Sequence, residues 1–183
     1  MPPAVTSQLA ATTAGAAADA SRLQTFAAMS AVLTGFLSSV IAPQLDPIDL
    51  KASYLATADA KAGTVLVDEL LQQFRSLKGR GLPDQAIANA LLATAGGAPA
   101  PAALLARSIV KLWYLGSWYD AAGNGNVVSA NAYIGGLAWR AAQAHPMGAS
   151  QLNFGYWASP PPPLEQFGVG SSADGGTTGG NHG

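Results

Sequence analysis

The sequence predicts an all-α fold, a small bundle of about five to six helices with an irregular Pro/Gly-rich C-terminal arm. Apolar residues recur every three or four positions in several successive segments, as expected for helices with one buried face. Proline, glycine and small polar residues separate these segments at positions typical of helix ends. Apolar residues also form 49% of the 183 residues, which is enough for the core of one domain.

Composition divides the chain into four parts. Residues 1–20 carry no charge before Asp19 and predict a flexible arm or the remnant of a leader, although a secretory leader also needs a positively charged start. Residues 21–147 form the predicted helical domain. Glycine and proline then become frequent, and the polyproline-like sequence SPPPP predicts an extended partner-binding arm over residues 148–168. The glycine-rich residues 169–183 predict a flexible tail.

Three helices are predicted in the first half of the helical domain. Ser21 is a suitable N-cap for a helix that runs to about Leu37. In the sequence LDPID, Asp46 can cap a second helix, because Pro47 fits the first helical position. A third helix, with leucine and phenylalanine side chains four residues apart on one face, is expected over residues 61–77, where KGRG ends it.

The second half begins with a short predicted helix, LPDQAIANALLAT, which AGGAPAP ends. Pro101 opens the most apolar helix of the chain, which is expected to run to about Asp120. Residues 123–126 form a predicted turn, because glycine and asparagine alternate there. Val127 and Val128 then suggest a brief extended piece.

The last predicted helix, ANAYIGGLAWRAAQA, is capped by Ser129 and ends at Pro146. Gly135 and Gly136 lie in its middle, where each costs about 1 kcal/mol relative to alanine. Such glycines are expected where another stretch of backbone packs closely. The sequence therefore predicts a tight contact at this point of the helix.

Charged residues are scarce, at 10% of the chain against about 25% in ordinary soluble domains. The shortage favours a surface that a partner protein covers, with an alanine-rich monomer as the alternative. The net charge of −1 indicates no excess of basic residues that would attract nucleic acid or anionic lipid. The absence of cysteine excludes disulfides, cysteine–zinc sites, iron–sulfur clusters and covalent haem attachment in this chain.

The inventory of reactive residues argues against catalysis, so we expect no catalytic, cofactor-binding or metal-binding residue in this chain. His145 and His182 are the only histidines, and a zinc site needs three or four ligands. Ser129 and His145 could be imagined in a catalytic triad, but the sharp G-x-S-x-G nucleophile turn is missing. The sequence GNG at residues 123–125 lacks the third glycine of a dinucleotide fingerprint.

Aromatic residues concentrate in residues 109–148, which hold three of the four tryptophans and three of the five tyrosines. On the predicted helix, Trp113 widens the main apolar stripe, while Tyr114 and Trp118 share a second face at i, i+4 spacing. Either this helix lies at the centre of the bundle, or one of its aromatic faces meets a partner. Tryptophan and tyrosine are the residues that interface hot spots favour.

Four motifs carry a resemblance to a known family. They are LWYLGSWYD, VVSANAYIGGLAW, AHPMG and FGYWASPPP, and the matching stretch covers roughly residues 109–162. It resembles the small subunits of bacterial membrane-bound, FAD-dependent sorbitol dehydrogenases and related sugar and polyol dehydrogenases. The earlier part of the chain shares with that family only the pattern F-x-x-x-S-x-x-L-T-G, which starts at Phe26.

The resemblance implies a non-catalytic accessory subunit. In that family a large flavoprotein subunit oxidises the sugar alcohol on FAD, and a multihaem cytochrome c subunit passes electrons to membrane quinone. The small subunit binds the large one, supports its maturation like a chaperone and helps it reach the periplasm through a twin-arginine leader. The present sequence has no twin arginine, since Arg22 stands alone. A periplasmic location, at the inner membrane through the complex, is therefore implied by the resemblance and not read from a leader.

We expect the aromatic helices and the segment from His145 to Pro163 to bind the flavoprotein. The segment would lie as an arm across the partner, with His145 as a hydrogen-bonding hinge. The expected interface residues are Trp113, Tyr114, Trp118, Tyr133, Trp139, His145, Pro146, Met147, Phe154, Tyr156 and Trp157. Two other interpretations stay open. One is a stand-alone enzyme that uses His145 or a tyrosine, and the other is a structural or membrane-surface protein that acts through residues 26–42 without a flavoprotein.

Overall fold

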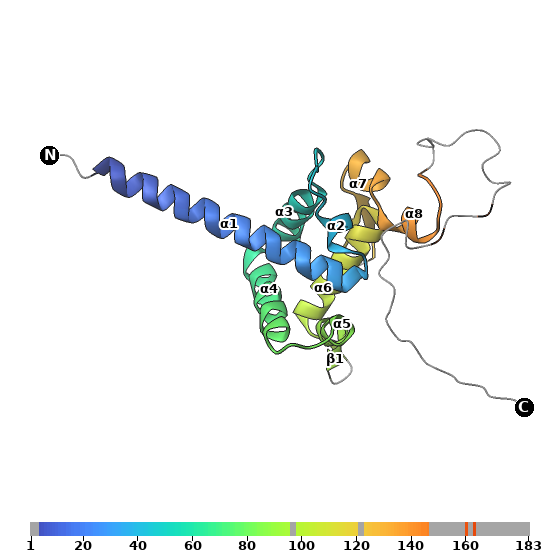
Figure 1. The fold of residues 1–183 in the computed structure, drawn as a ribbon. Coiled ribbons are helices and arrows are strands. Elements are labelled where there is room, and N and C mark those ends of the chain that lie inside the picture. The colour runs from blue at the N-terminus through green and yellow to red at the C-terminus, as the bar shows by residue number, and fades with distance from the viewer. Residues whose placement is uncertain (1–3, 96–97, 121–122, 147–159, 161–162, 164–183) are drawn as a thin grey trace, which may run out of the picture.

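The computed structural model describes residues 4–95, 98–120, 123–146, 160 and 163, and it confirms the all-α fold class (Figure 1). The longer helices are α1 (Ala4–Thr34), α3 (Leu50–Ala62), α4 (Thr64–Gly79), α5 (Asp84–Leu92) and α6 (Pro101–Leu115). The shorter helices are α2 (Ser38–Ile41), α7 (Ala130–Ile134) and α8 (Leu137–Ala141). Two antiparallel strand pairs complete the described elements: β1 (Thr94–Ala95) with β2 (Ala98–Pro99), and β3 (Ser117–Tyr119) with β4 (Gly125–Val127).

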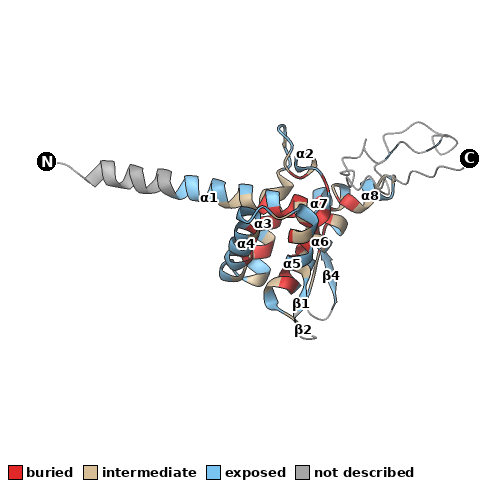
Figure 2. Ribbon diagram, turned by 60° about the horizontal axis from the view of Figure 1, so that its bottom comes forward, coloured by how far each residue is buried: buried red, intermediate tan, exposed pale blue. Residues whose placement is uncertain are grey.

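α6 is the central helix of the bundle. It contacts α1, α3, α4 and α5, and these contacts bury Leu105, Ala106, Ile109 and Leu112. Figure 2 shows that buried residues concentrate where the helices face one another. A helix that is surrounded by others must be apolar on more than one face, which accounts for the apolar sequence of α6.

The first helix is longer than the sequence predicts. It begins at Ala4, so the predicted start at Ser21 is wrong, and residues 4–20 are helical where a flexible arm or a leader remnant was expected. This stretch is rich in alanine, the strongest helix former, and contains no proline after residue 3. Its first half extends away from the bundle (Figure 1). The helix ends before Gly35, whose φ of +75° lies outside the helical region.

The next helix start also differs from the prediction. Asp49 caps α3, because its carboxylate accepts a hydrogen bond from a backbone N–H of the first turn. Asp46, the predicted cap, instead accepts from the Asp49 N–H at 2.8 Å and pairs with Lys51 at 2.9 Å. Gly63, with a φ of +86°, then separates α3 from α4. The helix predicted over residues 61–77 therefore starts after this glycine.

The most apolar predicted helix ends early. α6 stops before Gly116, which adopts a left-handed φ of +63°. Residues 117–119 then form β3, which pairs with β4 and places Trp118 opposite Asn126. Trp118 therefore lies on a strand, and the helical face that it was expected to share with Tyr114 does not exist.

The last predicted helix is divided in two. Ser129 caps α7 as expected, and its Oγ accepts a hydrogen bond from the Ala132 N–H at 3.0 Å. Gly135 and Gly136 separate α7 from α8, so they do not lie inside one helix. A Cβ atom on Gly136 would lie 2.9 Å from the Tyr114 carbonyl oxygen. The predicted close approach of another backbone is confirmed.

One ion-pair network joins three helices. Arg22 of α1 donates to Asp59 of α3 through both terminal nitrogens, at 2.7 and 2.8 Å, and its Nε donates to Asp68 of α4 at 2.6 Å. Hydrogen bonding to Asp59 is the main cause that raises the pKa of Arg22 above its ordinary value. The side chains of Arg22 and Asp59 are each 21% exposed, so this bidentate pair is more sheltered than an ordinary surface ion pair.

The apolar stretch at residues 26–42 lies largely inside the fold. Phe26, Met29 and Ile41 are at most 1% exposed. Among the described residues, no helix combines the length and the apolar character that a bilayer crossing requires. Most of the large apolar side chains of this stretch therefore pack in the core, and Leu37, which is 48% exposed, is the exception.

Candidate partner interface

Trp113 belongs to the core. It is 2% exposed, and its ring meets that of Tyr54 edge-on, with centroids 4.7 Å apart and planes at 87°. The Tyr54 hydroxyl donates to the Ala132 carbonyl oxygen at 3.4 Å, so the aromatic pair links α3 and α6 to α7. Burial raises the pKa of Tyr54 to about 12. The prediction that Trp113 contacts a partner is therefore wrong, because its ring fills the centre of the bundle.

Tyr114 holds the C-terminal end of α1. Its hydroxyl donates to the Thr34 carbonyl oxygen at 3.0 Å, and its ring lies edge-on to Phe36, with centroids 6.0 Å apart. Thr34 is the last residue of α1, where backbone carbonyl groups lack partners within the helix. Burial raises the pKa of the Tyr114 hydroxyl. The half-buried ring thus has a structural role, and its contact with a partner stays a prediction.

Tyr133 and Trp139 form an ordered aromatic pair near the surface. Their rings are edge-on, with centroids 5.4 Å apart and planes at 77°. The Trp139 Nε1 donates to the Tyr133 carbonyl oxygen at 2.9 Å, which fixes the orientation of the indole. Both residues are half-buried, and the neighbouring Ile134 is 51% exposed. Rigid, partly exposed aromatic side chains of this kind are common anchors in protein interfaces.

His145 and Pro146 lie just after α8, where the described part of the chain approaches the predicted arm. Both are half-buried, and the His145 Nδ1 lies 3.1 Å from the Pro146 carbonyl oxygen. Gln143 has a left-handed φ of +54°, so the backbone changes direction immediately before them. The following predicted interface residues lie outside the described residues: Met147, Phe154, Tyr156 and Trp157. The same holds for residues 148–168 apart from Pro160 and Pro163.

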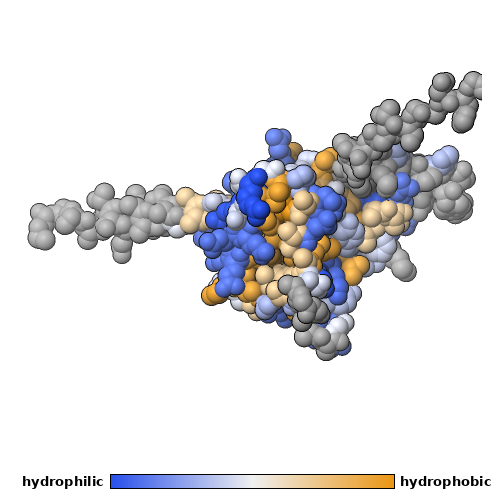
Figure 3. All heavy atoms as spheres, turned by 90° about the horizontal axis from the view of Figure 1, so that it is seen from below, coloured by the Kyte–Doolittle hydropathy of each residue, from blue (hydrophilic) through white to orange (hydrophobic). Residues whose placement is uncertain are grey.

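Several large apolar side chains outside the expected set of interface residues are exposed. Their exposed fractions range from 43% to 90%. They are Leu37, Leu45, Ile48, Val65, Leu104, Leu115, Val127 and Ile134. Figure 3 shows hydrophobic surface between hydrophilic areas on one face of the protein. Exposed apolar surface is typical of interaction sites, and it agrees with the small share of charged residues.

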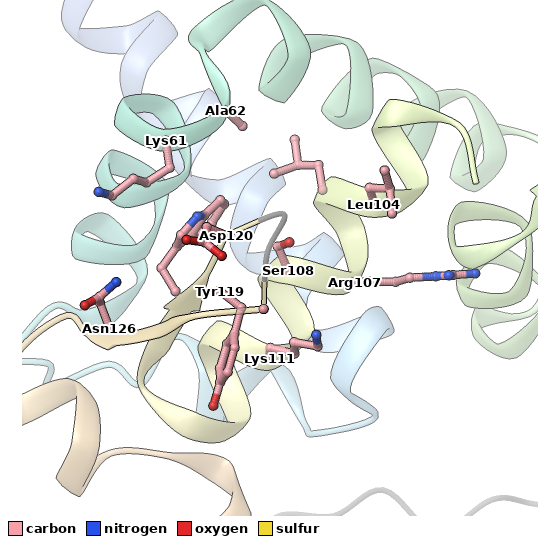
Figure 4. A pocket seen from close by; sticks show the side chains of 12 residues that line it. Lys61, Ala62, Leu104, Arg107, Ser108, Lys111, Tyr119, Asp120 and Asn126 are labelled. Atoms are coloured by element: carbon pink, nitrogen blue, oxygen red, sulfur yellow. The ribbon is translucent and has the colours of Figure 1, made fainter. Parts of the chain in front are cut away.

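A groove of about 690 Å³ lies between the C-terminal end of α3, one side of α6 and the β3–β4 hairpin (Figure 4). Leu104, Leu105 and Trp118 contribute apolar groups to it. Three cationic residues also line the groove: Lys61, Arg107 and Lys111. Trp118 thus lines a concave surface of the described fold.

The basic character of this groove was missed in the sequence. Arg107 and Lys111 are one helical turn apart on an otherwise apolar helix, and this spacing could have indicated a basic stripe. No sequence pattern connects Lys61 with them, because it comes from another helix. Within the described ranges, no group of three histidine, aspartate or glutamate residues could hold a metal ion. No family model, no curated protein and no solved structure matches the chain.

Proposed function

We propose that the chain is the non-catalytic small subunit of a membrane-associated, FAD-dependent sugar or polyol dehydrogenase complex. It binds the large flavoprotein subunit and supports the maturation, stability and export of that subunit to the periplasm. FAD belongs to the large subunit, and a multihaem cytochrome c is a further partner of the complex. The motif stretch that resembles such small subunits motivates the identity of the partner.

The observation that carries the binding role is the surface formed by α7 and α8. The Tyr133–Trp139 pair is held in place by a hydrogen bond, so it loses little side-chain entropy when a partner covers it. Ile134 adds an apolar side chain that is 51% exposed. Burial of such apolar surface contributes about 25 cal/mol per Å². A partner that covers this surface therefore gains free energy without first having to order it.

The position of this surface suits the predicted arm. His145 and Pro146 follow a turn after α8, in which the Ala144 N–H donates to the Trp139 carbonyl oxygen at 2.8 Å, so the last described residues before the arm lie close to the backbone of the aromatic pair. A stiff proline-rich segment also loses little entropy on docking. The α7–α8 surface and the arm together would provide a continuous contact with the flavoprotein.

The proposal is tested by producing the large flavoprotein subunit with and without this chain in the same bacterial host. We expect the flavoprotein made alone to show less bound flavin, less export and lower sugar-alcohol oxidation with an artificial electron acceptor. The chain alone should show no such oxidation. Equal flavin content, export and activity of the flavoprotein in both preparations would contradict the proposal.

A further inference from the structure

The groove between α3, α6 and the β3–β4 hairpin gathers an unusual share of the cations of the chain. Lys61, Arg107 and Lys111 line it, and they are three of only nine lysine and arginine residues. Within the part of the chain that the structure describes, none of the three forms an ion pair. Arg107 donates to the Leu92 carbonyl oxygen at 2.9 Å, and the Lys111 ammonium lies 5.1 Å from the centre of the Tyr119 ring. No carboxylate of the described residues therefore neutralises these three cations.

The one anionic residue in the groove is engaged in the hairpin. The carboxylate of Asp120 accepts hydrogen bonds from the Asn124 N–H at 2.9 Å and from the Asn124 side-chain amide at 3.1 Å. Its own N–H donates to the Asn124 carbonyl oxygen at 3.1 Å. Asp120 thus stabilises the turn, and the groove keeps an excess of two positive charges from three cations and one anion.

The groove presents both charged and apolar groups. Figure 4 shows Lys61 and Arg107 extending toward opposite sides, with Asp120 between them and Leu104 on the side of Arg107. Leu104 is 49% exposed and Trp118 is half-buried, so both offer apolar surface to an occupant. Apolar contacts beside charged groups are usual in protein–protein interfaces.

We propose that this groove binds an acidic segment of a protein partner. An apolar side chain of the segment packs on Leu104 and Trp118. Carboxylates on both sides of that side chain pair with Lys61 on one rim and with Arg107 and Lys111 on the other. The inference rests on the proposed function, because the large flavoprotein subunit is the partner expected to carry the segment.

The spacing of the cations favours a segment of chain over a small anion. Arg107 and Lys111 are separated by about 6 Å along the helix axis, and Lys61 stands on a different helix. Figure 4 shows the side chains of Lys61, Arg107 and Lys111 extending in different directions, so an extended peptide with several carboxylates suits them better than a single small anion. The groove volume of about 690 Å³ also leaves room for more than one side chain.

The test measures binding of a synthetic peptide to the full chain by isothermal titration calorimetry. In the peptide, leucine and phenylalanine are flanked on both sides by glutamates. A second peptide has glutamines in place of the glutamates and tests whether the charges are needed. Acetate at the same carboxylate concentration tests whether a small free anion binds equally well. The groove variant is Lys61→Gln/Arg107→Gln/Lys111→Gln. The control is Arg75→Gln/Arg80→Gln, which removes two exposed cations at the far end of α4.

We expect the acidic peptide to bind more tightly than the glutamine peptide and more tightly than acetate. The groove variant should weaken that binding about ten-fold, since each exposed ion pair contributes a few-fold. The control variant should bind like the unmodified chain. Equal binding of the two peptides, equal binding of peptide and acetate, or unchanged binding by a folded groove variant would each overturn the inference. If the triple variant fails to fold, Lys61→Gln/Lys111→Gln is used, and its affinity for the acidic peptide should fall about four-fold. Unchanged affinity of this folded double variant would likewise overturn the inference.

The peptide experiment separates this inference from the proposed function. If the chain binds the acidic peptide but forms no complex with the flavoprotein, the groove remains a binding site for acidic segments and the proposed function is contradicted. A complex that the groove variant forms as tightly as the unmodified chain would contradict the groove as the docking site and leave the proposed function standing.

Discussion

Gly116 lies directly against the backbone of Ala132: a Cβ atom on Gly116 would stand 2.3 Å from the Ala132 carbonyl oxygen. Gly116 ends α6, and Ala132 is buried at the centre of α7. The same carbonyl oxygen accepts the hydrogen bond from Tyr54. The absence of a side chain at residue 116 therefore allows the central helix to meet the surface proposed to bind the partner.

Replacement of Gly116 should break this contact. We expect Gly116→Ala to lower the free energy of unfolding by about 2–4 kcal/mol, because it adds a clash with backbone to the cost of a left-handed φ. Gly123→Ala is the matched control, since Gly123 has a φ of +85° but no atom of the described residues, its chain neighbours apart, within 4 Å of the added Cβ. The control should lose only about 1–2 kcal/mol. Urea denaturation measures both variants, and equal losses would show that the close approach has no energetic consequence.

The Arg22 network should stabilise the protein measurably. Arg22→Ala leaves the sheltered Asp59 carboxylate without its bidentate partner, so we expect a loss of about 1–3 kcal/mol in the free energy of unfolding. Arg75→Ala removes an exposed arginine that forms no ion pair with the described residues, and it should change stability by less than about 0.5 kcal/mol. Thermal unfolding compares the variants. A loss no larger than that of the control would mean that the three-helix network does not contribute.

Burial of Tyr54 predicts a pH dependence in the alkaline range. Its pKa is about 12 in the folded protein and 10.0 for an ordinary tyrosine, so the unfolded chain loses this proton first. Stability contributed by the buried phenol is therefore complete below pH 10 and declines as the pH rises toward 12, by up to roughly 1.4 kcal/mol per pH unit. In Tyr54→Phe the decline should be shallower, with a remainder from Tyr114. Identical slopes in urea titrations between pH 10 and 12 would contradict the burial of the hydroxyl.

The α7–α8 surface should tolerate polar substitution in the free chain but not in the complex. Ile134→Asn should leave the stability within about 0.5 kcal/mol, because Ile134 is 51% exposed. It should weaken binding of the flavoprotein about ten-fold, which corresponds to about 1.4 kcal/mol. Val65→Asn, on the 72% exposed side chain of α4, is the control and should bind normally. Surface plasmon resonance gives both affinities, and normal binding by Ile134→Asn would remove this surface from the interface.

The arm predicted after α8 can be tested by truncation. A chain that ends at Gly148 loses the aromatic and proline-rich sequence, and we expect it to bind the flavoprotein at least about thirty-fold more weakly, the effect of losing one anchor worth about 2 kcal/mol. A chain that ends at Gly170 should bind normally. If the shorter chain binds and matures its partner like the longer one, the helical surface alone carries the contact.

Local sequence patterns predict those features of this fold that depend on one residue. The Ser129 cap and the close approach at Gly136 were predictable, because each depends on a single residue with a specific conformational property. The course of the chain after Gly116 was not, since Trp118 fits a helical pattern and a short strand equally well. The pairing of β3 with β4 decides between them, and this pairing depends on a hairpin that forms only with the whole fold.

The same limit applies to the candidate interface. The apolar periodicity of α6 indicated a buried helix, but it could not show that Trp113 uses its ring in contact with Tyr54. The start of α1 was missed because the composition of residues 4–20 resembles a leader as much as a helix. The groove was missed because Lys61 and Lys111 come together only through the packing of α3 beside α6.

We propose that this chain forms a stable complex with an FAD-dependent dehydrogenase subunit. Size-exclusion chromatography of the full chain mixed with the purified large flavoprotein subunit, with protein and flavin absorbance recorded together, tests this complex. We expect the chain to move into one peak with the flavin and with the sugar-alcohol oxidising activity. Ile134→Asn should reduce that shift, while Val65→Asn should not. Elution of the unmodified chain apart from the flavin, at concentrations well above micromolar, would show that the complex does not form.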